Sequence, residues 1–113
     1  MVLPQWHERQ AMKRKCAVTG ASGYVGSRIV AYMQNHGWEV LALTRSRGSR
    51  LHAASASYSL EDSISPDTFP GFDALIHCAY DFQPITQKDI WRINVEGTAR
   101  LFAAAHKAAI DKI

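Results

Sequence analysis

The sequence predicts an α/β fold: an incomplete, open, doubly wound parallel sheet with helices on both faces. Short apolar runs alternate with longer segments of helical period. A turn punctuated by glycines joins the first apolar run to the first helix. The run at residues 73–79 is apolar without polar alternation, as in a parallel strand that is buried on both faces. With right-handed connections, the expected strand order is 3-2-1-4.

Size and composition favour one globular domain. The chain has 113 residues, of which 47% are hydrophobic and 20% charged. No apolar run approaches the roughly 20 residues that span a bilayer, so we expect no membrane partner. The first ten residues lack the apolar centre of a secretory signal, and we expect a cytoplasmic protein. Cys16 and Cys78 lie in apolar runs without a CxxC pattern or Cys/His cluster, which favours buried thiols over a metal site.

The formal net charge of +3 comes largely from two basic clusters, at residues 13–15 and at Arg45, Arg47 and Arg50. Neither cluster has interleaved aromatic residues. We therefore expect no nucleic-acid partner.

Residues 1–14 show no clear period and are expected to be an N-terminal extension, followed by one domain over residues 15–113. Within the domain, residues 15–44 predict one βαβ unit with strands at 16–19 and 39–44. The helix between these strands should pack through one face, formed by Val25, Ile29, Val30 and Met33.

The second half predicts a loose loop or short helix over 46–57, a brief third strand at 58–60 and a fourth strand at 73–79. A long helix is predicted from Thr86 to Ala109, with an apolar stripe at helical spacing. Another strand should begin at residues 111–113.

The segment Thr19-Gly20-Ala21-Ser22-Gly23-Tyr24-Val25-Gly26 is the most informative motif. It follows a predicted strand and opens a predicted helix, the context in which helix N-termini bind phosphates. Gly20 would permit the tight turn, Gly23 would let a pyrophosphate approach the backbone, and Gly26 would let the helix pack closely. The alternative is a glycine-rich turn without a ligand.

The GxxGxxG spacing, ending in Tyr24-Val25-Gly26, resembles that of extended short-chain dehydrogenases/reductases, the NAD(P)-dependent epimerase/dehydratase family. Phe72–Ala79 resembles the family's D-x-V-I-H-x-A strand, and Asn94–Thr98 its N-V-x-G-T helix motif. The resemblance covers roughly residues 14–113 and implies a Rossmann-like fold that binds a dinucleotide.

The end of the second predicted strand bears on the choice of cofactor. NAD-preferring sites usually carry an acidic residue there, which bonds to the ribose 2′-hydroxyl. This chain has Thr44-Arg45-Ser46-Arg47 instead. The guanidinium groups of Arg45 and Arg47 suit a 2′-phosphate and Ser46 can add a hydroxyl, so we expect NADP to be preferred over NAD. The alternative is a solvated basic loop.

The resemblance implies further cofactor contacts. Ser59 stands where the family usually has an Asp that bonds to adenine, and Tyr80 replaces a small residue, which narrows the groove. His77 is expected to be a hydrogen-bonded core histidine without a catalytic role. The expected cofactor-binding residues are Gly20, Ser22, Gly23, Tyr24, Val25, Gly26, Arg45, Ser59, Leu60, Cys78, Ala79, Tyr80 and Asn94.

Members of this family react through a Tyr-x-x-x-Lys pair, and no tyrosine of this chain is followed by lysine at that spacing. We therefore expect no catalytic residue here, but the N-terminal part of an oxidoreductase or epimerase/dehydratase. A small-molecule substrate and a homodimer are expected only for a full-length form. The alternatives are a non-catalytic NADP(H)-binding or regulatory module and a domain that acts through protein contacts. The unpaired edge of strand 4 predicts that this chain alone is marginally stable or aggregates.

Overall fold

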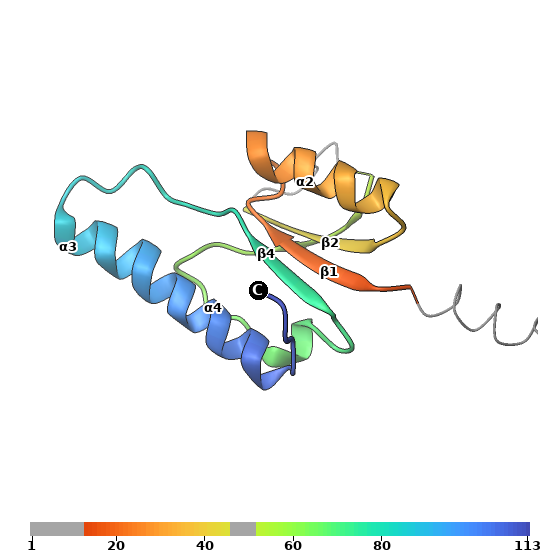
Figure 1. The fold of residues 1–113 in the computed structure, drawn as a ribbon. Coiled ribbons are helices and arrows are strands. Elements are labelled where there is room, and N and C mark those ends of the chain that lie inside the picture. The colour runs from red at the N-terminus through yellow and green to blue at the C-terminus, as the bar shows by residue number, and fades with distance from the viewer. Residues whose placement is uncertain (1–12, 46–51) are drawn as a thin grey trace, which may run out of the picture.

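A computed structural model describes residues 13–45 and 52–113, and it has the predicted parallel sheet (Figure 1). The four strands pair in the order β3-β2-β1-β4, and every pair is parallel. This arrangement confirms the predicted fold class and strand order. The strands are β1 (Lys15–Thr19), β2 (Glu39–Thr44), β3 (Ala54–Ser57) and β4 (Ala74–His77).

Helices cover both faces of the sheet (Figure 1). On one side α2 (Tyr24–Asn35) connects β1 to β2. On the other side a continuous helix is built from α3 (Gln87–Ile90), the π-helical segment η2 (Trp91–Val95) and α4 (Glu96–Lys107). The predicted long helix is thus present, but its π-helical middle was not foreseen. No helix within the two described ranges is long and apolar enough to span a membrane.

The apolar run of β1 supplies both layers of the core. Cys16 and Val18 are fully buried and pack with Val30 of α2. Ala17, between them, is also fully buried and packs on the other face with Leu101 of α4. Side chains alternate between the two faces of a strand, so a central strand with helices on both sides must be apolar throughout.

The third strand was predicted wrongly. It lies at Ala54–Ser57, inside the segment expected to be a loop or short helix, and not at residues 58–60. Its residues are alanine and serine, mostly exposed, so no apolar pattern marks them. The strand forms because the backbone pairs with β2 at the edge of the sheet, from Leu41 opposite Ala54 to Thr44 opposite Ser57. Residues 46–51 of the expected loop lie outside the described residues.

The basic residues next to β1 have local partners. The carbonyl of Arg14 accepts a hydrogen bond from the Glu39 amide at 2.9 Å, and its guanidinium lies 5.8 Å from the centre of the Trp38 ring. The ammonium of Lys15 lies 3.9 Å from the Glu39 carboxylate. Residues 1–12 of the expected extension lie outside the described residues.

At residues 111–113, where a fifth strand was expected to begin, the structure has a single bridge and no strand. Lys112 forms this isolated parallel bridge with Ala74 of β4, and its carbonyl accepts a hydrogen bond from Leu75 at 2.9 Å. The sheet of the described residues thus ends at β4, and the fifth strand stays a prediction.

The segment after β3 is held against α4 by two features. A methyl group on Gly97 would collide with the carbonyl oxygen of Leu60, so only glycine allows this approach. The guanidinium of Arg100 donates a hydrogen bond to the same oxygen at 2.9 Å. The position of Leu60 is therefore fixed by the helix.

A chain of hydrogen bonds ties β1, β4 and α4 together at one end of the sheet. Thr19 Oγ1 accepts bonds from the amides of Cys78 and Ala79, at 3.0 and 3.1 Å. With both acceptor positions filled, the Thr19 hydroxyl donates to Nδ1 of His77 at 2.6 Å. Nε2 of His77 then carries the proton and donates to Thr98 Oγ1 at 2.9 Å. Burial lowers the pKa of His77, in keeping with a neutral ring, and the expectation of a hydrogen-bonded histidine is confirmed.

We expect Gly97→Ala to destabilise the fold, although alanine is the better helix former. The added methyl group must displace the Leu60 carbonyl, and overpacking of this kind costs about 1–3 kcal/mol. Urea denaturation measures the loss. Ala99→Ser, an exposed change on the same helix, is the matched control and should have little effect. Equal stability of Gly97→Ala and the unmodified chain would contradict the close contact.

Stability should fall as the pH drops below about 6.5, the ordinary pKa of histidine. The pKa of folded His77 is lowered by burial, so the unfolded state takes up the proton first and acid favours unfolding. The free energy of unfolding, measured from pH 8 to pH 5, should decline less steeply in His77→Gln. His106→Gln, which removes an exposed histidine, should retain the decline of the unmodified chain.

Candidate functional site

The glycine turn brings the end of β1 close to the end of β4 and to the start of α2. Gly20 has φ of +62°, and a Cβ there would lie 2.9 Å from the Ala79 amide nitrogen. A Cβ on Gly26, in the first turn of α2, would collide with the carbonyl of Gly20. Both positions therefore require glycine, as predicted, although Gly26 packs against the turn itself.

The N-terminus of α2 opens toward the same place. Gly23 is its N-cap residue, and no side chain in the described residues caps the helix. The first amides of a helix have no partner within it, and the helix dipole adds partial positive charge there. The amides of residues 24–26 are therefore available to an anion.

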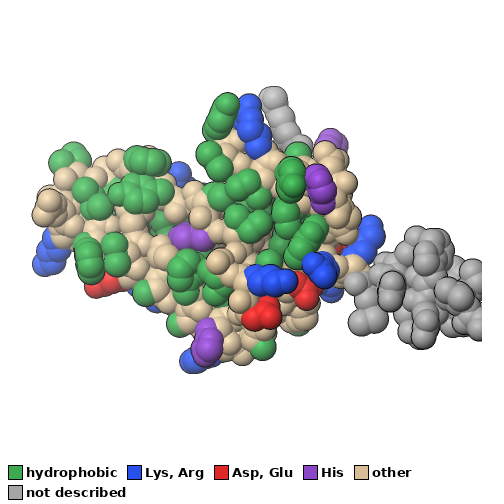
Figure 2. Space-filling view, viewed as in Figure 1, with side chains coloured by type: hydrophobic (Ala, Val, Ile, Leu, Met, Phe, Trp, Pro, Cys, Tyr) green, Lys and Arg blue, Asp and Glu red, His purple; other side chains and the backbone are tan. Residues whose placement is uncertain are grey.

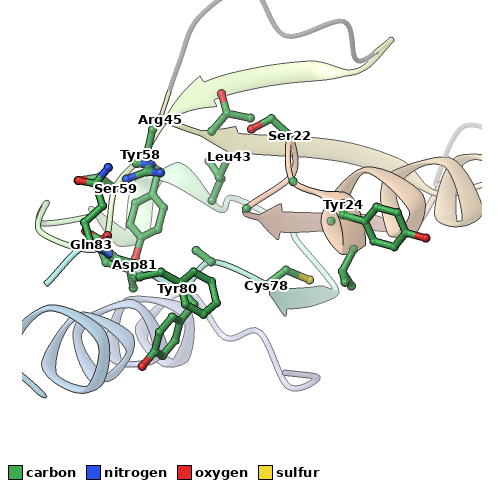
Figure 3. A pocket seen from close by; sticks show the side chains of 18 of the residues that line it. Ser22, Tyr24, Leu43, Arg45, Tyr58, Ser59, Cys78, Tyr80, Asp81 and Gln83 are labelled. Carbon is green, nitrogen blue, oxygen red and sulfur yellow. Dashed lines mark hydrogen bonds between the residues drawn. The ribbon is translucent and has the colours of Figure 1, made fainter. Parts of the chain in front are cut away.

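A cavity of about 630 Å³ lies over the turn, along the carboxyl ends of the strands (Figure 3). Every predicted cofactor-binding residue except Asn94 lines it. The predicted residues in its wall are Gly20, Ser22, Gly23, Tyr24, Val25, Gly26, Arg45, Ser59, Leu60, Cys78, Ala79 and Tyr80.

Val25 and Tyr24 lie differently from what the helical period suggested. Val25 was expected on the packed face of its helix, but it is 58% exposed and lines the cavity, because the buried face of α2 runs through Gly26 and Val30. The Tyr24 ring points away from the cavity (Figure 3), and the guanidinium of Arg28 lies 3.6 Å from its centre. Tyr24 therefore contributes to the site mainly through its backbone.

One end of the cavity is formed by the ends of β2 and β3. Figure 3 shows Arg45 close to Tyr58 and Ser59 there. The amide of Ser59 donates a hydrogen bond to the Asp62 carboxylate at 3.1 Å. An acidic residue is therefore present three positions after Ser59, the position where the family usually has an Asp. Ser46 and Arg47, which were predicted to assist Arg45, lie outside the described residues.

A further part of the cavity wall is formed by the segment after β4. The hydrogen bonds from Cys78 and Ala79 to Thr19 fix its backbone. Tyr80 and Phe82 follow, with their ring centres 4.6 Å apart, and both are largely exposed. Burial raises the pKa of the Cys78 thiol, which keeps it neutral in the cavity wall. Burial likewise raises the pKa of Cys16, in β1, to about 11.

Asn94, which was also predicted to bind the cofactor, is not among the residues that line the cavity and lies behind its wall. It is buried in the π-helical segment, where its Oδ1 accepts from the Asp81 amide at 2.7 Å. Its Nδ2 donates back to the Asp81 carbonyl at 3.0 Å. This reciprocal pair holds the segment that carries Tyr80 and Phe82. Its place within the π-helical turn is consistent with the frequent occurrence of such turns at functional sites.

Several lining residues were missed by the sequence analysis. Most of these residues are next to a predicted site residue in the sequence. Including the neighbours of each predicted residue near a strand end would have identified them. They are Leu43, Thr44, Tyr58, Glu61, Asp81, Phe82 and Gln83.

Residues 16–113 match the sequence profile of the NAD dependent epimerase/dehydratase family. A Synechocystis sp. protein named for dihydroflavonol 4-reductase is 33% identical over 103 residues, which are 84% of this chain and 30% of the relative. The sterol-4-alpha-carboxylate 3-dehydrogenase (decarboxylating) of Dictyostelium discoideum is 26% identical over 104 residues, 85% of this chain and 32% of the relative. The chain thus spans about a third of the length of these relatives.

Solved structures share the fold. A short-chain dehydrogenase/reductase superfamily protein from Agrobacterium tumefaciens, solved with bound NAD, superposes with a TM-score of 0.71 at 31% identity, over 86% of this chain and 30% of that one. UDP-N-acetylglucosamine 4-epimerase from Bacillus cereus gives a TM-score of 0.71 at 27% identity, over 87% of this chain and 36% of that one. Together with the glycine turn and the parallel sheet, the profile match shows that this chain belongs to the NAD-dependent epimerase/dehydratase family.

Proposed function

We propose that the chain binds an NAD(P) dinucleotide in the cavity over the glycine turn. The observation that carries this proposal is that one cavity joins the uncapped start of α2 to the carboxyl ends of the strands. The pyrophosphate would lie on the amides of residues 24–26, because these are free and Gly23 leaves their approach open. The adenosine half would extend toward Arg45 and Ser59, and the nicotinamide half toward Cys78 and Ala79.

We further propose that NADP is preferred over NAD. Arg45 is exposed at the end of β2 and lines the cavity, where it can meet a 2′-phosphate. The last residue of β2, Thr44, is not acidic and cannot take the place of the carboxylate that recognises a free ribose 2′-hydroxyl. The bound NAD of the Agrobacterium relative supports the dinucleotide but leaves this preference as our proposal.

In a longer form, the domain would serve an NAD(P)-dependent oxidoreductase or epimerase/dehydratase in the cytoplasm. The substrate would be a small carbonyl or hydroxyl compound or a nucleotide sugar, and the longer protein would form a homodimer. The nicotinamide would supply hydride transfer, whereas the residues of this chain bind and orient the cofactor. The names of the relatives, a reductase, a sterol dehydrogenase and a nucleotide-sugar epimerase, support this range of substrates.

A second candidate is a non-catalytic NADP(H)-binding module. The observation in its favour is that residues of this chain line the cavity, whereas no tyrosine of the given sequence is followed by a lysine at the catalytic spacing. The coding sequence downstream discriminates between the two. An in-frame Tyr-x-x-x-Lys supports the enzyme, whereas a natural stop codon together with NADPH binding supports the module.

Dinucleotide binding should weaken when a side chain is added in the glycine turn. Gly23→Val places a branched side chain where the pyrophosphate must approach the backbone, and we expect affinity for NADP⁺ to fall at least about tenfold. Isothermal titration calorimetry measures the affinity, and circular dichroism checks the fold. Ala31→Val, on the exposed side of α2, is the matched control. Unchanged binding by Gly23→Val would contradict the proposed pyrophosphate position.

The preference for NADP should depend on Arg45. Charged hydrogen bonds contribute about 1.5–3 kcal/mol, so Arg45→Glu should lower the ratio of NADP⁺ to NAD⁺ affinity by roughly 10- to 100-fold. Lys88→Glu makes a similar charge change in α3, outside the cavity wall, and should leave the ratio unchanged. Tighter binding of NADH than of NADPH by the unmodified protein would contradict the preference.

A further inference from the structure

Tyr58 carries an unpaired polar atom at the edge of the cavity. It directly follows β3, and its amide donates a hydrogen bond to the Thr44 carbonyl at 2.8 Å, which continues the pairing of β3 with β2. The residue is only 4% exposed and packs in the core that faces α4. Its hydroxyl oxygen is buried and has no hydrogen-bond partner among the described residues.

The two charged groups that act electrostatically on Tyr58, Arg100 and Asp62, have hydrogen bonds to other residues. The Arg100 guanidinium bonds to the Leu60 carbonyl, and the Asp62 carboxylate accepts the Ser59 amide. Burial raises the pKa of Tyr58, so the hydroxyl keeps its proton and can both donate and accept. A buried hydroxyl without a partner is costly, and native proteins rarely leave one unsatisfied.

The position of the Tyr58 side chain indicates where a hydrogen-bond partner for its hydroxyl would lie. Tyr58 lines the cavity, and Figure 3 shows its ring extending from the end of β3 toward the segment that carries Tyr80 and Asp81. Arg45 and Ser59 lie beside it in the same view. Tyr80 and Phe82, which also line the cavity, are 50% and 85% exposed.

We propose that Tyr58 is a cofactor-binding residue, and that its hydroxyl takes its missing hydrogen bond from the adenosine half of the dinucleotide. This inference rests on the proposed function and adds a specific polar contact to it. The ligand reaches the hydroxyl by displacing the side chains that close over it. The bond offsets the cost of burying the hydroxyl, so it contributes to affinity and not to the stability of the ligand-free chain.

Tyr58→Phe tests the proposal because it removes only the oxygen atom. Tyr32→Phe, an exposed tyrosine on α2 outside the cavity wall, is the matched control. Calorimetric titration should use NADP⁺ and, for the adenosine half alone, 2′,5′-ADP. We expect Tyr58→Phe to weaken both by roughly five- to thirtyfold, with a ligand-free melting temperature that is unchanged or raised. The control should match the unmodified protein in every measurement.

Three results would overturn the proposal. If the unmodified chain binds NADP⁺ and Tyr58→Phe binds it equally well, the role of Tyr58 is refuted while the proposed function stands. If only NADP⁺ is weakened and 2′,5′-ADP is not, the assignment to the adenosine half is refuted. If the unmodified chain binds neither ligand, the proposed function fails and the role of Tyr58 fails with it.

A second measurement needs no variant. A buried hydroxyl that gains a hydrogen bond should change the ¹³Cζ resonance of its tyrosine when 2′,5′-ADP is added to the unmodified protein. Spectra in which no tyrosine ¹³Cζ resonance moves at saturating ligand would overturn the proposal, even if Tyr58→Phe failed to fold.

Discussion

The end of β1 must meet the end of β4 with no side chain between them, and the rest of the structure depends on this approach. Gly20 leaves room for the backbone of Ala79, and Thr19 receives the amides of Cys78 and Ala79 on its hydroxyl. Because β1 is central, both helical layers are placed by the same strand. A larger residue at either position would separate the two strand ends and open the floor of the cavity.

The site that results is built mainly from backbone. The turn offers amides and a helix dipole. Two side chains hold other parts of the cavity wall by hydrogen bonds to the backbone: Asn94 bonds to Asp81, and Arg100 bonds to Leu60. At the glycine turn, backbone amides can hold and orient a phosphorylated ligand without a charged side chain, and the acidic residues Glu61 and Asp81 line the cavity elsewhere. Under the proposed function, binding energy would come from the glycine turn, and selectivity from the few side chains around it.

Much of this was predictable from the sequence, and the failures have physical reasons. β1, β2, β4 and the helices are marked by apolar runs and glycines whose spacing reflects local geometry. β3 is not marked, because an exposed edge strand of alanine and serine is determined by its pairing. Asn94 stands four residues after Ile90 and three before Gly97, so a regular helical period already turns it inward, but its reciprocal hydrogen bonds to Asp81 are a matter of tertiary packing. The unpaired hydroxyl of Tyr58 is a property of tertiary packing, so no local pattern could reveal it.

The pairing register of β1 also implies an order of assembly. Cys16 pairs with Val40 on one side and with Ala74 on the other, so one partner is close along the chain and the other is distant. Closing a long loop costs more chain entropy, and distant pairings form more slowly. We therefore expect the βαβ unit to form before β4 docks. The cavity is lined by residues on both sides of β1, so we expect it to form late in folding and to be lost early when the sheet opens.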